Sequence, residues 1–150
     1  MKLEEEIKQN IPFGNEYTKL AVNILYTHGW LSNLQSEYLK KYLITTSQYN
    51  ILRILRGQHP KPASINLLKE RMLDKMSDAS RLVDRLVTKE LVERKVCIND
   101  RRKVEVIITA KGLELLTALE KIEDEQKNIL KNLSIDEAKT LNKLLDKLRG

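Results

Sequence analysis

Residues 76–109 constrain the fold most strongly, because their hydrophobic period changes from that of a helix to that of a strand. In the first part, apolar residues recur every three or four positions, which predicts a helix with one buried face. That face comprises Met76, Ala79, Leu82, Val83, Leu86 and Val87. The opposite, polar face comprises Asp78, Ser80, Arg81, Asp84 and Arg85. After Leu91 the period falls to two, which predicts strands.

The second part of this stretch predicts a β-hairpin with a basic tip. Alternating apolar residues run through 92–98 and through 104–108, and the turn formers Asn99 and Asp100 lie between them. Three cations, 101–103, follow the turn. A helix beside such a hairpin suits duplex nucleic acid, since the helix fits a major groove about 12 Å wide and the hairpin reaches a neighbouring groove or phosphates.

Two short helices are predicted ahead of this stretch. Thr45 and Gln48 have the spacing of a capping box, which predicts a helix that ends at Gly57. Ser64 is a suitable N-cap for a second helix over residues 65–73. Together with the helix that follows, they form a helix-turn-helix, and the hairpin makes it the winged form. The predicted fold class is mainly α with a small β-hairpin.

Long apolar seams at both ends of the chain predict further helices. One seam runs through residues 15–42, and another runs through 110–133. Ser134 and Glu137 have capping-box spacing and predict the start of a last helix. The unit between these seams spans only residues 45–109 and covers part of their apolar surface. The seams therefore permit a dimer, and packing within one chain is the alternative.

Positive charge is concentrated on the helix and hairpin. The chain carries a net charge of +6. Residues 81–103 hold eight basic and four acidic side chains, whereas residues 111–150 hold eight of each. Such a patch attracts phosphate and makes binding dependent on salt. From charge alone, an ordinary solvated basic surface is an equal alternative.

The sequence offers little for catalysis or metal binding. His28 and His59 lie far apart without ligand partners at suitable spacing, and the five glycines form no phosphate loop. We expect no enzyme activity, metal or cofactor. The single cysteine, Cys97, is interpreted as a small apolar residue in a strand. No apolar run reaches the roughly 20 residues that span a bilayer, and residues 1–10 lack the apolar centre of a signal peptide, so we expect a cytoplasmic protein without a membrane partner.

Residues 80–109 resemble the recognition helix and wing of MarR-type winged-helix transcriptional repressors. The pattern runs from a Ser-Arg pair and an Arg-Leu pair in the helix, through an Asp-x-Arg wing, to a threonine after the last strand. The matching residues are Ser80, Arg81, Leu82, Val83, Arg85, Leu86, Leu91, Val92, Glu93, Arg94, Asp100, Arg102, Ile108 and Thr109. The segment TTSQYNILRIL from Thr45 resembles the same family. Glu90 departs from the pattern, which has a turn glycine there, and this predicts a different helix cap.

The resemblance implies a homodimeric regulator that binds double-stranded DNA, usually as a repressor at a palindromic operator. A two-fold dimer would present its recognition helices about 34 Å apart. The implied organisation is a single domain with a DNA-binding lobe at residues 45–109 and dimerisation helices at residues 1–44 and 110–150. The alternative is a winged-helix module that binds proteins, against which the basic wing argues.

The candidate DNA-contacting residues lie around the recognition helix and the wing. They are Lys75, Ser77, Asp78, Ser80, Arg81, Arg85, Lys95, Asp100, Arg101, Arg102 and Lys103. Arg81 either binds a guanine through two hydrogen bonds, holds a phosphate, or pairs with Asp78 or Asp84. By resemblance, Arg102 enters the minor groove and Asp100 orients it.

The resemblance also implies a small aromatic effector that binds between the dimer helices and the DNA-binding lobe and releases the DNA. Candidate pocket residues are Tyr26, His28, Trp30 and Tyr38. The alternative, which we favour, is that these side chains belong only to the core or to the subunit interface.

Overall fold

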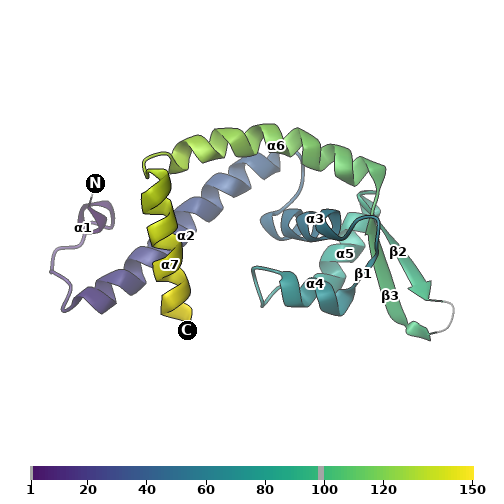
Figure 1. Cartoon of the computed structure of the whole chain (residues 1–150), viewed down its shortest axis with the longest axis horizontal. Coiled ribbons are helices and arrows are strands. Elements are labelled where there is room, and N and C mark those ends of the chain that lie inside the picture. The colour runs from purple at the N-terminus through teal and green to yellow at the C-terminus, as the bar shows by residue number, and fades with distance from the viewer. Residues whose placement is uncertain (1, 98–99) are drawn as a thin grey trace. The chain divides into compact units, whose positions relative to one another are not determined.

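The computed structural model describes residues 2–97 and 100–150 (Figure 1). The elements in chain order are α1 (Leu3–Glu6), α2 (Glu16–Lys40), α3 (Thr46–Gln58), β1 (Ala63–Ser64), α4 (Ile65–Arg71), α5 (Ala79–Thr88), β2 (Val92–Cys97), β3 (Asp100–Ile108), α6 (Ala110–Leu130) and α7 (Ile135–Arg149). The predicted fold class is confirmed, since helices dominate and a small antiparallel sheet accompanies them. The chain divides into two compact units, Met1–Asn50 and Ile51–Gly150.

In the N-terminal unit, α2 is a long helix over the predicted range. Asn15 caps it, since its Oδ1 accepts a hydrogen bond from the Thr18 N–H at 2.9 Å. An ion pair of 2.6 Å between Lys19 and Glu4 joins α2 to α1. Most apolar side chains of α2 are exposed within this unit, including Tyr17 at 85%.

The predicted capping box at the start of α3 is confirmed. The Thr45 N–H donates to Gln48 Oε1 at 3.1 Å, and the Gln48 N–H donates to Thr45 Oγ1 at 3.2 Å. The predicted end at Gly57 is wrong by one residue, because α3 continues to Gln58. Pro60 explains the stop, since the residue before a proline disfavours helical backbone.

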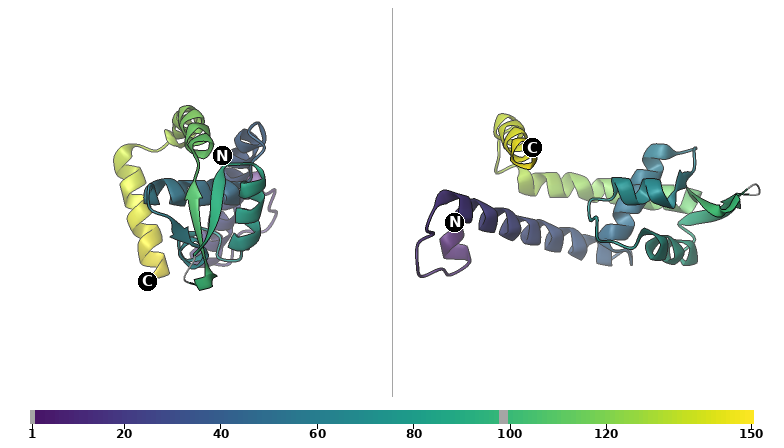
Figure 2. Two further views of the ribbon diagram at one scale, coloured as in Figure 1. Left: turned by 90° about the vertical axis from the view of Figure 1, so that its right-hand side faces the viewer. Right: turned by 90° about the horizontal axis from the view of Figure 1, so that it is seen from below.

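In the C-terminal unit, α4 and α5 pack with a three-stranded sheet of order β1-β3-β2. Figure 2 shows β2 and β3 as a twisted hairpin, as predicted. The third strand, β1, was not predicted; Ala63 pairs with Val106 and Ser64 with Glu105. The core residues of this unit include Ile51, Leu52, Leu55, Ala63, Leu68, Met72, Ala79, Val83, Leu86, Leu91, Val92, Val106, Ile108, Leu116 and Leu119.

Helix α5 buries only part of the predicted apolar face. Ala79, Val83 and Leu86 are fully buried, as predicted. The prediction that Met76 belongs to this buried face is wrong. Helix α5 begins at Ala79, and Met76 precedes it with 92% of its surface exposed. Val87, at the edge of the face, is 37% exposed.

The C-terminus of α5 has the geometry that favours glycine. Glu90 has a φ of 62°, in the left-handed region. The Glu90 and Leu91 N–H groups donate to the carbonyls of Val87 at 2.8 Å and Leu86 at 3.0 Å, the pattern of a Schellman cap. The prediction of a different cap is therefore wrong, because the chain keeps the left-handed cap and places a glutamate in it. An ion pair of 2.8 Å with Lys111 lowers the pKa of the Glu90 carboxyl.

Glu90→Gly is expected to raise the midpoint of thermal unfolding by a few degrees, because glycine adopts a positive φ without the steric cost of a Cβ. The exposed ion pair with Lys111 contributes little. Lys111→Met is the matched control, since it removes the same ion pair without changing the backbone, and its midpoint should stay close to the wild-type value. Circular dichroism during heating measures both, and a lower midpoint for Glu90→Gly than for Lys111→Met would contradict the prediction.

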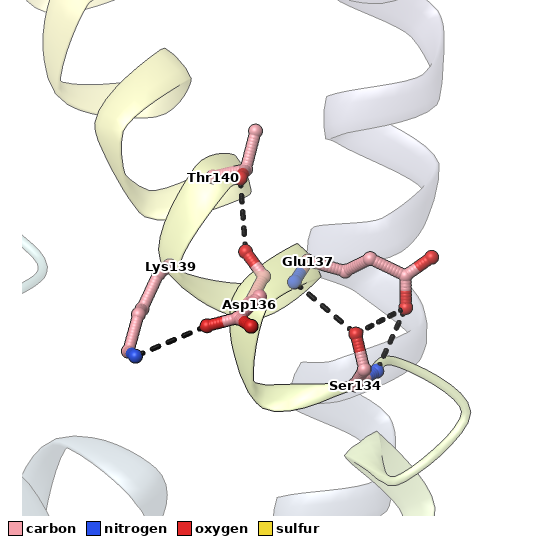
Figure 3. Close-up of polar contacts among 5 residues, drawn as sticks. All are labelled: Ser134, Asp136, Glu137, Lys139 and Thr140. Carbon is pink, nitrogen blue, oxygen red and sulfur yellow. Dashed lines mark hydrogen bonds and ion pairs between the residues drawn. The ribbon is translucent and has the colours of Figure 1, made fainter.

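The predicted capping box of α7 is confirmed (Figure 3). The Ser134 N–H donates to Glu137 Oε2 at 2.8 Å, and the Glu137 N–H donates to Ser134 Oγ at 3.3 Å. The bonds from Ser134 lower the pKa of the Glu137 carboxyl. On the same turn, Lys139 pairs with Asp136 at 3.1 Å, and the Thr140 hydroxyl donates to the Asp136 carbonyl at 2.9 Å.

Candidate nucleic-acid interface

The turn between α4 and α5 is held in one conformation by Asp74. Its Oδ1 accepts the Met76 N–H at 2.9 Å, and its Oδ2 accepts the Ser77 hydroxyl at 2.8 Å. These two bonds, the first being the stronger cause, lower the pKa of the Asp74 carboxyl. Lys75 Nζ donates to the Glu70 carbonyl at 2.5 Å, which ties the turn to the end of α4.

Several predicted DNA contacts therefore have a role in the fold. Asp78 is the N-cap of α5, and its Oδ1 accepts the Arg81 N–H at 3.1 Å. Ser77 and Lys75 use polar atoms within the turn described above. This arrangement fixes where α5 begins and how its first residues are presented. Sequence reasoning assigned these three residues to DNA alone and missed their capping and turn contacts.

The polar face of α5 presents two arginines. Arg81 and Arg85 are exposed and lie four residues apart, so they share one face of the helix. Ser80 is half-buried beside Arg81. No carboxylate within the described part of the chain forms an ion pair with either arginine. Both guanidinium groups are thus available to acceptors from outside the protein.

Asp84, the acid between these arginines, pairs with Arg94 on β2. The pair connects the recognition helix to the first strand of the wing. The structure therefore does not support the alternative in which Arg81 pairs with Asp78 or Asp84. Asp78 caps α5, and Asp84 pairs with Arg94. The sequence analysis assigned Arg94 no role of its own. The ion pair could have been predicted from the positions of Asp84 on the helix and Arg94, ten residues later, on the following strand.

On the wing, Lys95 and Lys103 are exposed. Lys95 lies opposite Glu105 in the antiparallel register of β2 and β3. Asp100 is the first residue of β3, paired in register with Cys97, rather than a residue of the turn as predicted.

Some predicted features of the wing fall on residues or side chains that the structure does not describe. Ile98 and Asn99 lie outside the described residues, as do the side chains of Cys97, Arg101 and Arg102. The backbones of Arg101 and Arg102 belong to β3. The DNA contacts of these two arginines therefore stay predictions.

The four candidate effector-binding residues all lie on α2. Tyr26 and Trp30, about 40% exposed, are four residues apart and share a face. His28 lies roughly 200° around the helix from Tyr26, at about 100° per residue, and its Nε2 is 3.4 Å from Ser32 Oγ. Tyr38 is half-buried. Since these residues do not share one face, α2 alone does not bring all four into a common site.

Within the parts of the chain that the structure describes, no cluster of three or more His, Cys, Asp or Glu side chains is arranged to hold a metal ion. No helix among the same residues combines the length and apolarity needed to span a membrane.

A helix-turn-helix followed by a two-stranded wing defines the winged-helix class of DNA-binding proteins. A family model described as MarR family matches residues 44–104. The Multiple antibiotic resistance protein MarR of Escherichia coli K12 is 33% identical over 136 residues, which cover 89% of this chain and 93% of that protein. The chain therefore belongs to the MarR family, whose members are transcription regulators rather than enzymes.

Solved structures agree with this assignment. A mutant of the E. coli MarR protein complexed with operator DNA is 30% identical and superimposes with a TM-score of 0.78, over 92% of this chain and 99% of that one. The Bordetella bronchiseptica regulator BpsR has a TM-score of 0.75 over 88% of this chain and 99% of its own. That structure concerns regulation of DNA binding by 6-hydroxynicotinic acid, and at 18% identity it shares the fold alone.

Proposed function

We propose that this chain is a homodimeric repressor that binds a palindromic operator in double-stranded DNA through α5 and the β2–β3 wing. The observation that carries the proposal is the pair Arg81 and Arg85, exposed and without an acidic partner among the described residues, on a helix whose start is fixed by Asp78. The E. coli MarR structure with operator DNA supports it. In that role, arginines of the recognition helix contact base edges and phosphates in the major groove.

A second copy of the chain is the proposed partner of the terminal helices. Within its own unit, α2 exposes Tyr17 at 85% and Leu25 at 70%. Helix α7 exposes Ile135 at 77% and Leu144 at 58%. Apolar surface of this kind is typical of subunit interfaces. Sedimentation equilibrium is expected to give twice the mass of the chain, and a monomer at micromolar concentration would refute the homodimer.

Selection of bound duplexes from a random library tests the proposed function directly. Enrichment of an inverted repeat, with affinity that falls steeply between two salt concentrations, would support it. Failure to enrich any sequence, with no binding at low salt, would favour the alternative of a winged-helix module that binds proteins.

We also propose that a small aromatic ligand releases the DNA. The regulation of BpsR by 6-hydroxynicotinic acid supports this, whereas the partly exposed rings of Tyr26 and Trp30 are open either to such a ligand or to a second subunit. Titration of aromatic acids into the protein–DNA complex tests it, with loss of anisotropy as the expected result. If none of the acids displaces the duplex, the effector proposal fails while DNA binding stands.

Arg102→Ala is expected to weaken operator binding and to reduce the dependence of log affinity on log salt concentration by about two, because the homodimer loses one cationic contact in each half-site. The midpoint of thermal unfolding should not fall. Fluorescence anisotropy at several salt concentrations measures the first effect and circular dichroism the second. Wild-type affinity in this variant would remove the wing arginine from the mechanism.

A further inference from the structure

The turn between α4 and α5 exposes two large apolar side chains beside the proposed DNA-binding face. Leu73 is 87% exposed and Met76 is 92% exposed, while their neighbour Met72 is buried at 2%. The sequence spacing had placed Met76 in the core. Its exposure therefore identifies an apolar group that the fold does not use.

The exposure of Met76 does not come from a loose segment. Its own N–H is held by Asp74 Oδ1 at 2.9 Å, and the next residue, Ser77, donates its hydroxyl to the same carboxylate at 2.8 Å. Two residues later, Asp78 caps α5. The backbone that carries Met76 is thus fixed on both sides, and Met76 lies three residues before Ala79, the first residue of α5, whose first turn carries Ser80 and Arg81.

The chemistry of the major groove suggests what such a group binds. Base edges there present hydrogen-bond donors and acceptors, and the C5-methyl group of thymine is the apolar feature that a protein can read. A methionine side chain is flexible and polarisable, so it adapts to a small apolar partner. Its position next to the recognition helix makes this contact continuous with the proposed DNA interface.

We propose that Met76 is a specificity-determining residue that contacts the C5-methyl group of a thymine in the operator. The inference rests on the proposed DNA-binding function and adds to it an apolar contact beside the polar ones of Arg81. The contact favours an A·T pair with thymine on one particular strand, at a position next to the bases that the start of α5 reaches.

Replacement of thymine by uracil tests the proposal, because it removes only the methyl group. The probes are duplexes taken from the random-library selection, with the thymines of one half-site replaced one at a time. For the wild type, one replacement is expected to weaken binding about fourfold, the fold-change that corresponds to burial of one methyl group. Met76→Gln, which keeps the length of the side chain but makes it polar, should bind thymine and uracil duplexes equally well at that position.

Two further variants make the result specific. Met76→Leu keeps an apolar side chain and should keep the preference for thymine. Arg81→Ala should bind the thymine duplex and the uracil duplexes, all of which keep the guanine, more weakly and yet retain the same uracil effect, which shows that loss of affinity alone does not remove it. Because Met76 is exposed, circular dichroism should give the same unfolding midpoint for both Met76 variants as for the wild type.

The outcomes separate this inference from the function on which it rests. A wild type that binds all uracil duplexes as tightly as the thymine duplex, or a Met76→Gln variant with an unchanged uracil effect, would overturn the inference and leave DNA binding intact. A selection that enriches no duplex would refute the proposed function itself.

Discussion

Gly112→Val is expected to destabilise the protein by about 2–4 kcal/mol, the largest effect on stability that the structure predicts. A Cβ at this position of α6 would lie 2.4 Å from the Leu91 carbonyl oxygen and 2.7 Å from Ile108 Cγ1. The carbonyl cannot move away easily, because it accepts the Thr109 N–H at 3.1 Å. Urea denaturation followed by circular dichroism measures the change in the free energy of unfolding.

The matched control is Gly57→Ala in α3. An added Cβ there meets nothing within 4 Å, and alanine is favoured over glycine in a helix by about 0.5–1 kcal/mol. We therefore expect this variant to be as stable as the wild type or slightly more stable. A Gly112→Val variant that unfolds at the wild-type urea concentration would show that α6 does not approach Leu91 as closely as the structure has it.

Features coded by neighbouring residues were predictable from the sequence. The capping boxes at Thr45 and Ser134 join residues three positions apart, so their spacing alone identifies them. The change of period after Leu91 located the start of the hairpin at Val92, because side-chain periodicity follows directly from backbone geometry.

Features that depend on distant residues were not predictable in this way. Strand β1 has two residues and no period of its own, and it exists because Ala63 pairs with Val106. The close approach of Gly112 to Leu91 joins residues 21 positions apart. Met76 was misassigned for a local reason, since the helical spacing was extended backwards across Asp78, where the N-cap ends the helical backbone.

The exposure of the basic face of α5 was predictable from the sequence, but the contacts of its acidic residues were not. The basic face of α5 followed from its period and its charges. The contacts of its two acidic residues did not follow from the sequence pattern. Asp84 pairs with Arg94 on β2, and Asp78 accepts a hydrogen bond from a backbone N–H. These contacts leave Arg81 without an acidic partner among the described residues, which raises the effect expected from its removal.

Arg81→Ala is expected to weaken binding to the selected operator by about thirtyfold or more, because a side chain that forms two hydrogen bonds with a guanine contributes about 1–3 kcal/mol of discrimination and the homodimer loses this contact in both half-sites. The expectation depends on the start of α5 entering the major groove. At this end of the helix, Asp78 caps the first turn and Arg81 is exposed. Anisotropy titrations with the operator and with a duplex changed at one guanine measure the effect. Stability should not change, since Arg81 forms no ion pair within the described chain.

Arg85→Ala separates a base contact from a phosphate contact on the same face. Arg85 lies one turn further along α5, and a phosphate contact there in each protomer would weaken binding to every duplex alike and lower the salt dependence by about two. Arg81→Ala should instead remove the preference for one base pair while it retains most of the salt dependence. If both variants lose affinity equally for all sequences, both arginines bind phosphates, and recognition of the operator must come from other residues of α5, the turn or the wing.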